Sequence, residues 1–351
     1  MFDKYLRHIA VHTGQNYDYE LNGIFYKDLE LRKPDYYLGV DTSSLGHVLG
    51  ETLIKVEEVF KKEKPDAVLI LEDTNASIAA IMAKRMKIPI YHMEAGNRSF
   101  DSNVPEEINR SIIDHIADFN LVYTENSRRH LLSEGLAHRR IYLTGSPMYE
   151  VLKYYKDRID KSDILEKLNL KKRGYFIVSA HREENVDYTE NLKRILLILN
   201  RLAEQYNVTI IVSTHPRTRK RLESINDMRI DERIQFLKPF GFMDYNYLQM
   251  NAICAISDSG SISEESAMFN FPAVTIRNSM ERPEAIDVGT IILTGFDMNI
   301  VLDSVQLAVD EHKNCGYSHI TPEYQVENTS WRVLKLVLGT TKLSNEWRNT
   351  S

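Results

Sequence analysis

Short apolar runs rich in Val and Ile alternate with longer amphipathic stretches along most of the chain, and this alternation restricts the fold more than any other feature. Parallel strands covered on both faces are continuously apolar, whereas helices repeat their apolar residues every three or four positions. The runs are residues 7–14, 66–71, 88–94 and 119–124, and the stretches with helical spacing are 47–64, 76–87 and 105–118. This order predicts a βαβ series with a parallel sheet.

A second series of the same kind follows. Its expected strands are 175–180, 208–214, 234–240, 252–257, 272–277 and 290–295, and its expected helices lie around 188–205, 262–269 and 297–312. The most polar connection, residues 153–174, marks the boundary, and 351 residues exceed the usual size of one domain. We expect an α/β protein of two Rossmann-like, doubly wound domains, 1–160 and 161–329. A C-terminal helix within 330–351 is expected to pack back on the first domain.

The composition excludes several classes of protein. A net charge of −6, without Lys and Arg runs among aromatic residues, argues against nucleic-acid binding. No apolar run approaches the roughly 18 residues of a membrane span, and the start has no signal-peptide pattern. The cysteines, Cys254 and Cys315, cannot form a disulfide framework and are expected to be reduced thiols. These features predict a cytoplasmic protein without membrane or nucleic-acid partners.

Carboxylates come directly after two neighbouring strands of the expected first domain. Ligands of open parallel sheets bind beyond the carboxyl ends of the strands, so Asp73 and Glu94 should face one crevice. Asp73 could instead cap the next helix, whereas Glu94 would be costly to bury without partners or a function. Glu106 and Glu107 follow Pro105, so they could act at this site or only complement a helix dipole.

The second domain carries signals of an anion site. Residues 258–266, DSGSISEES, predict a turn that opens a helix, and such helix starts bind phosphate, although a plain turn and cap explains the pattern equally well. His181 and His215 each follow an expected strand with Arg nearby. Together they indicate a cationic pocket for a diphosphate, or else two structural histidines. The sequence has no metal motif, P-loop or G-x-S-x-G elbow, and no metal or other cofactor is expected.

Eight segments, taken in order, resemble the non-hydrolysing UDP-N-acetylglucosamine 2-epimerases. They are HTGQNYD (12–18), EDTNAS (72–77), EAGNRS (94–99), PEEINR (105–110), TGSPMYEVL (144–152), HREEN (181–185), DSGSISEES (258–266) and ERPEAIDVGT (281–290). The residues of these motifs are most similar to those of the branch that forms UDP-N-acetyl-L-fucosamine from a UDP-2-acetamido-2,6-dideoxy-L-talose for capsule and O-antigen synthesis. The resemblance implies a glycosyltransferase-B-like fold, a UDP-sugar as substrate and a homodimer.

The chemistry of that family would explain the acids. The C2 hydrogen of a 2-acetamido sugar is not next to a carbonyl group, so its direct removal would give an unstabilised carbanion. Elimination of UDP across C1 and C2 avoids this, because it leaves a 2-acetamidoglycal to which UDP returns after C2 is protonated on its other face. That route needs carboxylates as acid and base, and cations or amide donors for the diphosphate.

The resemblance assigns roles by position in these motifs. It implies that the catalytic residues are Asp73, Glu94, Glu106 and His181, with His181 contacting phosphate. It implies that the UDP-binding residues are His215, Ser259, Gly260, Glu265 and Arg282, with Glu265 on the ribose hydroxyls. Gln15 and Asn16 match positions where some bacterial members bind a second UDP-sugar as an activator.

The front of the chain departs from the family pattern. Family members begin with a strand and a GTRPE-like loop that supplies an Arg near the diphosphate, and this sequence contains neither. We expect the missing strand to leave an unpaired gap in the first domain and to remove a catalytic cation, and we expect an internal start or a truncated gene as the cause. Glu72 and Ser261 replace two glycines of the family pattern.

Other functions fit the same residues. A UDP-sugar glycosyltransferase shares the fold and the ribose-binding glutamate, although three acids in the first domain favour acid and base chemistry. An inactive UDP-sugar-binding homologue would follow from the missing segment. A hydrolysing epimerase, which releases UDP and free N-acetylmannosamine, is a third alternative.

Overall fold

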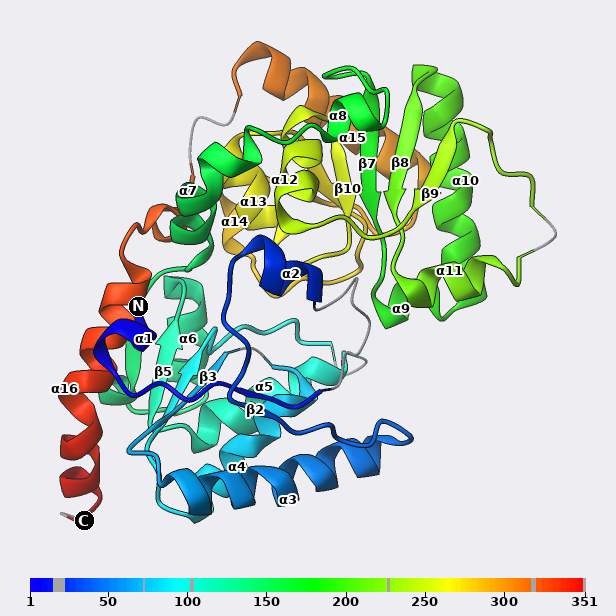
Figure 1. Cartoon of the computed structure of the whole chain (residues 1–351). Coiled ribbons are helices and arrows are strands. Elements are labelled where there is room, and N and C mark those ends of the chain that lie inside the picture. The colour runs from blue at the N-terminus through cyan, green and yellow to red at the C-terminus, as the bar shows by residue number, and fades with distance from the viewer. Residues whose placement is uncertain (15–22, 72, 102–103, 226–227, 317–319, 350–351) are drawn as a thin grey trace. The chain divides into compact units, whose positions relative to one another are not determined.

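The chain forms two compact units. The computed structural model describes residues 1–14, 23–71, 73–101, 104–225, 228–316 and 320–349. Unit 1 contains Met1–Tyr17, Arg32–Glu150 and Gln325–Ser351, and unit 2 contains Asp18–Leu31 and Val151–Tyr324. Each unit consists of parallel strands with helices packed against them (Figure 1). No helix in the described part of the chain is long and apolar enough to cross a membrane.

Two segments lie in a different unit from the expected one. Residues 151–160 were expected in the first domain but belong to unit 2. Most of them are part of helix α7 (Met148–Ile159), which overlaps the stretch expected as a polar connection. Residues 23–31 also belong to unit 2, where the Tyr155 hydroxyl donates a hydrogen bond to the Leu29 carbonyl oxygen at 2.6 Å. Both differences arise from tertiary contacts that local sequence patterns do not record.

The strands of unit 1 form two separate sets, both parallel. β1 (Val11–His12) pairs with β2 (Tyr36–Tyr37), and four further strands lie in the order β3, β4, β5, β6. The bounds of these four are Val68–Leu71, Ile90–Met93, Phe119–Val122 and Ile141–Leu143. The strand expected over residues 7–14 is only two residues long in the structure, and β1 has one hydrogen-bonded neighbour, β2.

Helices cover both faces of the four-stranded set, which explains its continuously apolar strands. One face packs against α3, α4 and α5 in a cluster that includes Phe60, Ala83 and Ile113. On the other face Tyr91 and Phe119, whose rings stack 4.5 Å apart, pack against α16. The helices of unit 1 are α1 (Phe2–Tyr5), α3 (Leu45–Glu63), η1 (Asn75–Ile78), α4 (Ala79–Arg85), α5 (Pro105–Ile116), α6 (Glu125–Ser133), η2 (His138–Arg140) and α16 (Thr329–Asn349).

An open groove of about 1180 Å³ lies between the two strand sets of unit 1. Val11–Thr13 line it on the side of β1, and Val68–Leu71 line it on the side of β3. A doubly wound sheet of six strands has the order 3-2-1-4-5-6. Because β1 and β3 both line the groove, a strand between them would complete this order from the two described sets. The groove therefore lies where an unpaired gap was expected.

The sheet of unit 2 contains the full doubly wound order, β9-β8-β7-β10-β11-β12, with all neighbouring strands parallel. The strands are β7 (Tyr175–Ser179), β8 (Thr209–Ser213), β9 (Ile234–Leu237), β10 (Ala255–Ser257), β11 (Ala273–Thr275) and β12 (Ile292–Leu293). The strand order reverses between β7 and β10, and ligands of such sheets bind beyond the strand ends at this reversal.

Two apolar clusters enclose this sheet. One includes Phe176 and Ile210 with Leu199 of α10 and Val305 of α15. The other lies on the opposite face, where Phe271 packs with α12 and α13. The helices of unit 2 are α2 (Gly23–Asp28), α7, α8 (Ile164–Lys167), α9 (Glu183–Val186), α10 (Thr189–Tyr206), α11 (Pro216–Leu222), α12 (Phe242–Asn251), α13 (Ile262–Phe269), α14 (Glu284–Asp287), α15 (Met298–Asn314) and the short η3 (Pro322–Gln325) at its end.

Candidate active site

Asp73 and Glu94 lie beyond the carboxyl ends of two adjacent strands of unit 1. β3 and β4 are parallel, with Leu71 opposite Met93, so the chain leaves both strands at the same edge of the sheet. Asp73 does not cap the following helix: the residue at the N-cap of η1 is Thr74. The two acids therefore share one sheet edge, next to the open groove.

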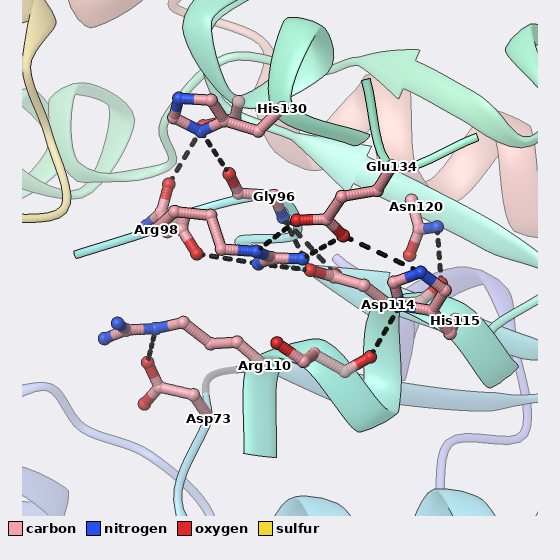
Figure 2. A network of polar contacts seen from close by, with 12 residues as sticks. Asp73, Gly96, Arg98, Arg110, Asp114, His115, Asn120, His130 and Glu134 are labelled. Atoms are coloured by element: carbon pink, nitrogen blue, oxygen red, sulfur yellow. Dashed lines mark hydrogen bonds and ion pairs between the residues drawn. The ribbon is translucent and has the colours of Figure 1, made fainter. Parts of the chain in front are cut away.

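Asp73 is held in place by α5. The Arg110 guanidinium forms an ion pair with the Asp73 carboxylate (Figure 2). The Asn109 amide donates a hydrogen bond to the Asp73 carbonyl oxygen at 2.8 Å. Arg110 is 4% exposed. The pair fixes the Asp73 carboxylate against a buried side chain of α5.

Glu94 occupies a turn with an unusual backbone. Its φ is +66°, in the left-handed region, and its carboxylate accepts a hydrogen bond from the Asn97 amide at 3.0 Å. Gly96, at φ +80°, packs so closely that a Cβ atom there would lie 2.4 Å from the Ser127 carbonyl oxygen. Only glycine fits this position, so the turn that carries Glu94 is tightly specified.

A buried polar network supports this turn from below (Figure 2). Asp114, which is fully buried, accepts hydrogen bonds from the Gly96 amide at 3.1 Å and from Arg98 at 2.7 Å, and it pairs with His92 at 2.8 Å. Burial raises the pKa of Asp114, but His92 and Arg98 outweigh this effect and lower it. Arg98 also forms two hydrogen bonds with Glu134, at 2.7 and 2.8 Å.

Glu106 and Glu107, both in the first turn of α5, have different surroundings. The Glu107 carboxylate accepts hydrogen bonds from the Ser99 amide and hydroxyl, each at 3.0 Å, and from Arg110 at 3.0 Å. Burial raises the pKa of Glu107, but these donors lower it overall. Glu106 makes no hydrogen bond or ion pair with a described residue. Glu107 is a structural acid.

In unit 2, the strand reversal brings the loop after β7 together with the turn after β10. Asp258 begins that turn and is fully buried. Its Oδ2 accepts hydrogen bonds from the backbone amides of His181 and Arg182, at 2.9 and 3.0 Å, and from the Asn185 side chain at 2.7 Å. One carboxylate thus fixes the loop that carries His181.

The Ser- and Gly-containing turn leads into α13, as the sequence predicted. The Ser259 and Ser261 hydroxyls lie 3.0 Å apart, and α13 begins at Ile262. A Cβ atom at Gly260 would lie 2.8 Å from a Glu281 carboxylate oxygen, so a larger residue would displace that side chain. The first N–H groups of a helix have no partner within it, which makes this start suitable for an anion.

Glu265 and Arg282 lie beside this turn. Glu265 is 8% exposed and accepts a hydrogen bond from Gln249 at 2.9 Å, and burial raises the pKa of its carboxyl. The Arg282 guanidinium donates to the Gly260 carbonyl oxygen at 3.2 Å and pairs with Glu264 at 3.3 Å. Arg282 thus holds the turn in shape.

His181 and His215 lie side by side, with ring centroids 6.1 Å apart and planes at 29°. His215 is also the N-cap of α11, and its Nδ1 accepts a hydrogen bond from the Arg217 amide at 3.1 Å. The structural interpretation is therefore correct for His215, and it does not exclude a ligand at the other ring nitrogen. The pair forms a local concentration of imidazole groups next to the α13 turn.

Some candidate residues lie outside the described part of the chain, namely Gln15, Asn16 and Glu72. Within the described part, no group of three or more His, Cys, Asp or Glu side chains is arranged to hold a metal ion.

Several residues that hold the candidate site residues in place were not identified from the sequence. Arg98, Asp114 and Asp258 all lie within or near the quoted motifs, but motif position alone assigned them no role. One signal was present: Arg110 and Asp114 are four residues apart in α5, on the same helix face as the buried Ile113. Charged residues at such spacing must have buried partners.

Comparison with known proteins places the whole chain beside one family. The family model described as "UDP-N-acetylglucosamine 2-epimerase" matches residues 2–338. A Methanocaldococcus jannaschii protein named UDP-N-acetylglucosamine 2-epimerase is 35% identical over 311 residues, which cover 87% of this chain and 85% of that protein. A Pseudomonas aeruginosa protein named UDP-2,3-diacetamido-2,3-dideoxy-D-glucuronate 2-epimerase is 32% identical over 308 residues, which cover 87% of this chain and 84% of that protein.

Solved structures agree. A structure of UDP-N-acetylglucosamine 2-epimerase from Rickettsia bellii is 48% identical, with a TM-score of 0.91 over 98% of this chain and 92% of that one. The Methanocaldococcus jannaschii enzyme, solved in complex with UDP-GlcNAc and UDP, is 32% identical. Its TM-score is 0.89, over 96% of this chain and 94% of that one.

Proposed function

Because the chain belongs to the UDP-N-acetylglucosamine 2-epimerase family, we propose that it inverts C2 of a UDP-2-acetamido sugar by elimination and re-addition of UDP. The family consists of isomerases, and its fold is α/β with two Rossmann-like units of the glycosyltransferase-B type. The observation that carries the proposal is the position of Asp73 and Glu94 beyond adjacent parallel strands, at one edge of the sheet.

Three acids of unit 1 would carry the proton transfers at C2. Asp73 is paired with Arg110, Glu94 is oriented by Asn97, and Glu106 has no described partner. One acid removes the C2 proton as UDP leaves, and another protonates the opposite face of the 2-acetamidoglycal. Such a pair of carboxylates in different surroundings is what acid and base catalysis on two faces of one carbon requires.

Unit 2 would hold the nucleotide. The start of α13 with Ser259 and Gly260, together with His181 and His215, would bind the diphosphate and stabilise the charge that UDP gains on leaving. Glu265 would accept hydrogen bonds from the ribose hydroxyls. Arg282 would act by holding the Gly260 carbonyl oxygen and thus the turn.

The first candidate substrate is UDP-N-acetylglucosamine, with UDP-N-acetylmannosamine as product. Two related enzymes, from Methanocaldococcus jannaschii and Neisseria meningitidis, were solved with UDP-GlcNAc bound. The L-talose-configured precursor of UDP-N-acetyl-L-fucosamine is the second candidate. Either product would serve cell-surface polysaccharide synthesis, such as capsule or O-antigen, and we propose a cytoplasmic homodimer.

The test is incubation with UDP-N-acetylglucosamine in D2O, followed by NMR. The proposal requires deuterium at C2 together with a new manno-configured UDP-sugar, and the Glu94→Gln variant should give neither. Free UDP and N-acetylmannosamine formed in equal amounts would indicate a hydrolysing enzyme instead. If neither UDP-N-acetylglucosamine nor the L-talose sugar is exchanged although both bind, the chain is a UDP-sugar-binding protein. A requirement for an acceptor would indicate a glycosyltransferase.

A further inference from the structure

The strongest unassigned feature is the relation between Asp258 and His181 in unit 2. Asp258 follows β10, and its backbone amide donates a hydrogen bond to the Ser179 carbonyl oxygen at the end of β7, at 3.1 Å. β7 and β10 are the two strands at the reversal of the sheet order, with Ser179 opposite Ser257. The carboxylate is therefore fixed by the sheet itself, directly below the loop that begins at His181.

The two carboxylate oxygens of Asp258 have different surroundings. Oδ2 accepts three hydrogen bonds, which come from the His181 amide, the Arg182 amide and the Asn185 side chain. Oδ1 has no hydrogen-bond donor of good geometry among the described residues, yet His181 Nδ1 lies 3.2 Å from it. A buried carboxylate oxygen without a donor is costly, and a proton on Nδ1 of this imidazole reduces that cost.

We propose that Asp258 is a positioning residue that keeps a proton on Nδ1 of His181 and fixes the ring, so that Nε2 faces the bound diphosphate. This inference rests on the proposed function. An aspartate that holds the far nitrogen of a histidine sets its tautomer and stabilises its protonated form. A protonated ring would donate from Nε2 to phosphate oxygens as UDP leaves, and it would carry a compensating positive charge.

The described charged groups around His181 support this arrangement. Burial raises the pKa of Asp258, but His181 and the donors of the loop outweigh it and lower the pKa to about 2, so the carboxylate is ionised at neutral pH. The Arg182 side chain donates to the Asp258 carbonyl oxygen at 2.9 Å and pairs with Glu281 at 3.0 Å, and the imidazole of His215 lies beside the ring. Asp258 is thus an ionised carboxylate in direct contact with the imidazole.

The first experiment uses the unmodified chain and needs no turnover. The ¹⁵N shifts of the His181 ring are followed during a pH titration and assigned with His181→Asn. We expect the neutral ring to carry its proton on Nδ1, which is opposite to the usual preference for Nε2. A proton on Nε2 of the neutral ring would overturn the proposal.

The second experiment compares Asp258→Asn with the parent chain in UDP binding by calorimetry and in exchange at C2. We expect UDP affinity to fall about tenfold at pH 8 and to recover near pH 6, and the alkaline limit of kcat/KM to move about one pH unit lower, because the carboxylate no longer stabilises the protonated ring. An equal loss at every pH would indicate a structural role alone and contradict the proposal.

Two controls separate the inference from other causes. Asp231→Asn makes the same isosteric change at the Arg233 ion pair of unit 2 and should leave both pH profiles unchanged. In a His181→Asn background, Asp258→Asn should cause no further loss of UDP affinity, since the effect acts through the ring. If the ring behaves as expected but no UDP-sugar is epimerised, the proposed function fails and the Asp258 inference stands.

Discussion

Arg98 donates a hydrogen bond to Asp114 at 2.7 Å, and neither side chain is more than 3% exposed. The pair joins the turn that carries Glu94 to the last turn of α5, the helix that also provides Glu106 and Arg110. Three of the residues around the proposed chemistry therefore depend on one buried interaction.

Removal of one partner should destabilise unit 1 strongly. We expect Asp114→Ala to lower the free energy of unfolding by about 3–5 kcal/mol, because it removes the fully buried acceptor shared by Arg98, His92 and the Gly96 amide. Urea unfolding monitored by circular dichroism measures the change. Asp160→Ala breaks an exposed pair with Lys156 and should change stability by less than about 0.5 kcal/mol. Similar losses in both variants would contradict the assigned role.

Glu106 and Glu107 offer a matched pair of substitutions. Glu106→Gln should abolish exchange at C2 and leave stability within about 0.5 kcal/mol, because its carboxylate has no described partner. Glu107→Gln should lower stability by about 1–3 kcal/mol through its lost hydrogen bonds to Ser99 and Arg110. Deuterium incorporation and urea unfolding distinguish them. A stable, inactive Glu107→Gln beside an active Glu106→Gln would reverse the assignment.

Acid should unfold unit 1 through the same carboxylates. The folded-state pKa values of Asp114 and Glu107 lie below their ordinary values of 3.8 and 4.5. Their contribution to stability is therefore complete above the ordinary values and disappears as the pH falls through the folded values. We expect the contribution of these two carboxylates to be constant from pH 7 to about pH 5, and the free energy of unfolding to fall steeply below about pH 4. Glu107→Gln should show a shallower fall, and an unchanged slope would count against this origin.

The open groove of unit 1 should bind an apolar dye. Leu71 is half exposed and lines the groove beside β3. An environment-sensitive dye should therefore fluoresce with the folded chain, and Leu71→Lys should reduce the signal several-fold. Leu307→Lys alters an exposed leucine of unit 2 outside the groove and should leave the signal unchanged. Equal effects of both substitutions would show that the dye binds elsewhere.

The strand pattern of both sheets was readable from the sequence, because covered parallel strands are continuously apolar and their helices are periodic. The same rule placed Asp73 and Glu94 at one sheet edge and His181 near the turn after β10. The buried pairs could not be found this way. Asp114 meets Arg98, and Asp258 meets His181, only through the register of neighbouring strands and the turn of a helix. Such contacts depend on tertiary structure, which local spacing does not encode.

The first unit also could not be delimited by pattern alone. Residues 23–31 follow β1 in the sequence but belong to unit 2, because the Leu29 carbonyl oxygen finds its donor on Tyr155. That assignment depends on a partner far away in the chain.

The packing of α16 on Tyr91 and Phe119 has a consequence for synthesis on the ribosome. Unit 2 is closed by residue 324, whereas the far face of the unit 1 sheet is covered only when residues 329–349 emerge. We therefore expect the later part of the sequence to reach its native state first, and the earlier part to wait for translation of α16. During that interval the exposed aromatic face of β4 and β5 would be a binding surface for chaperones.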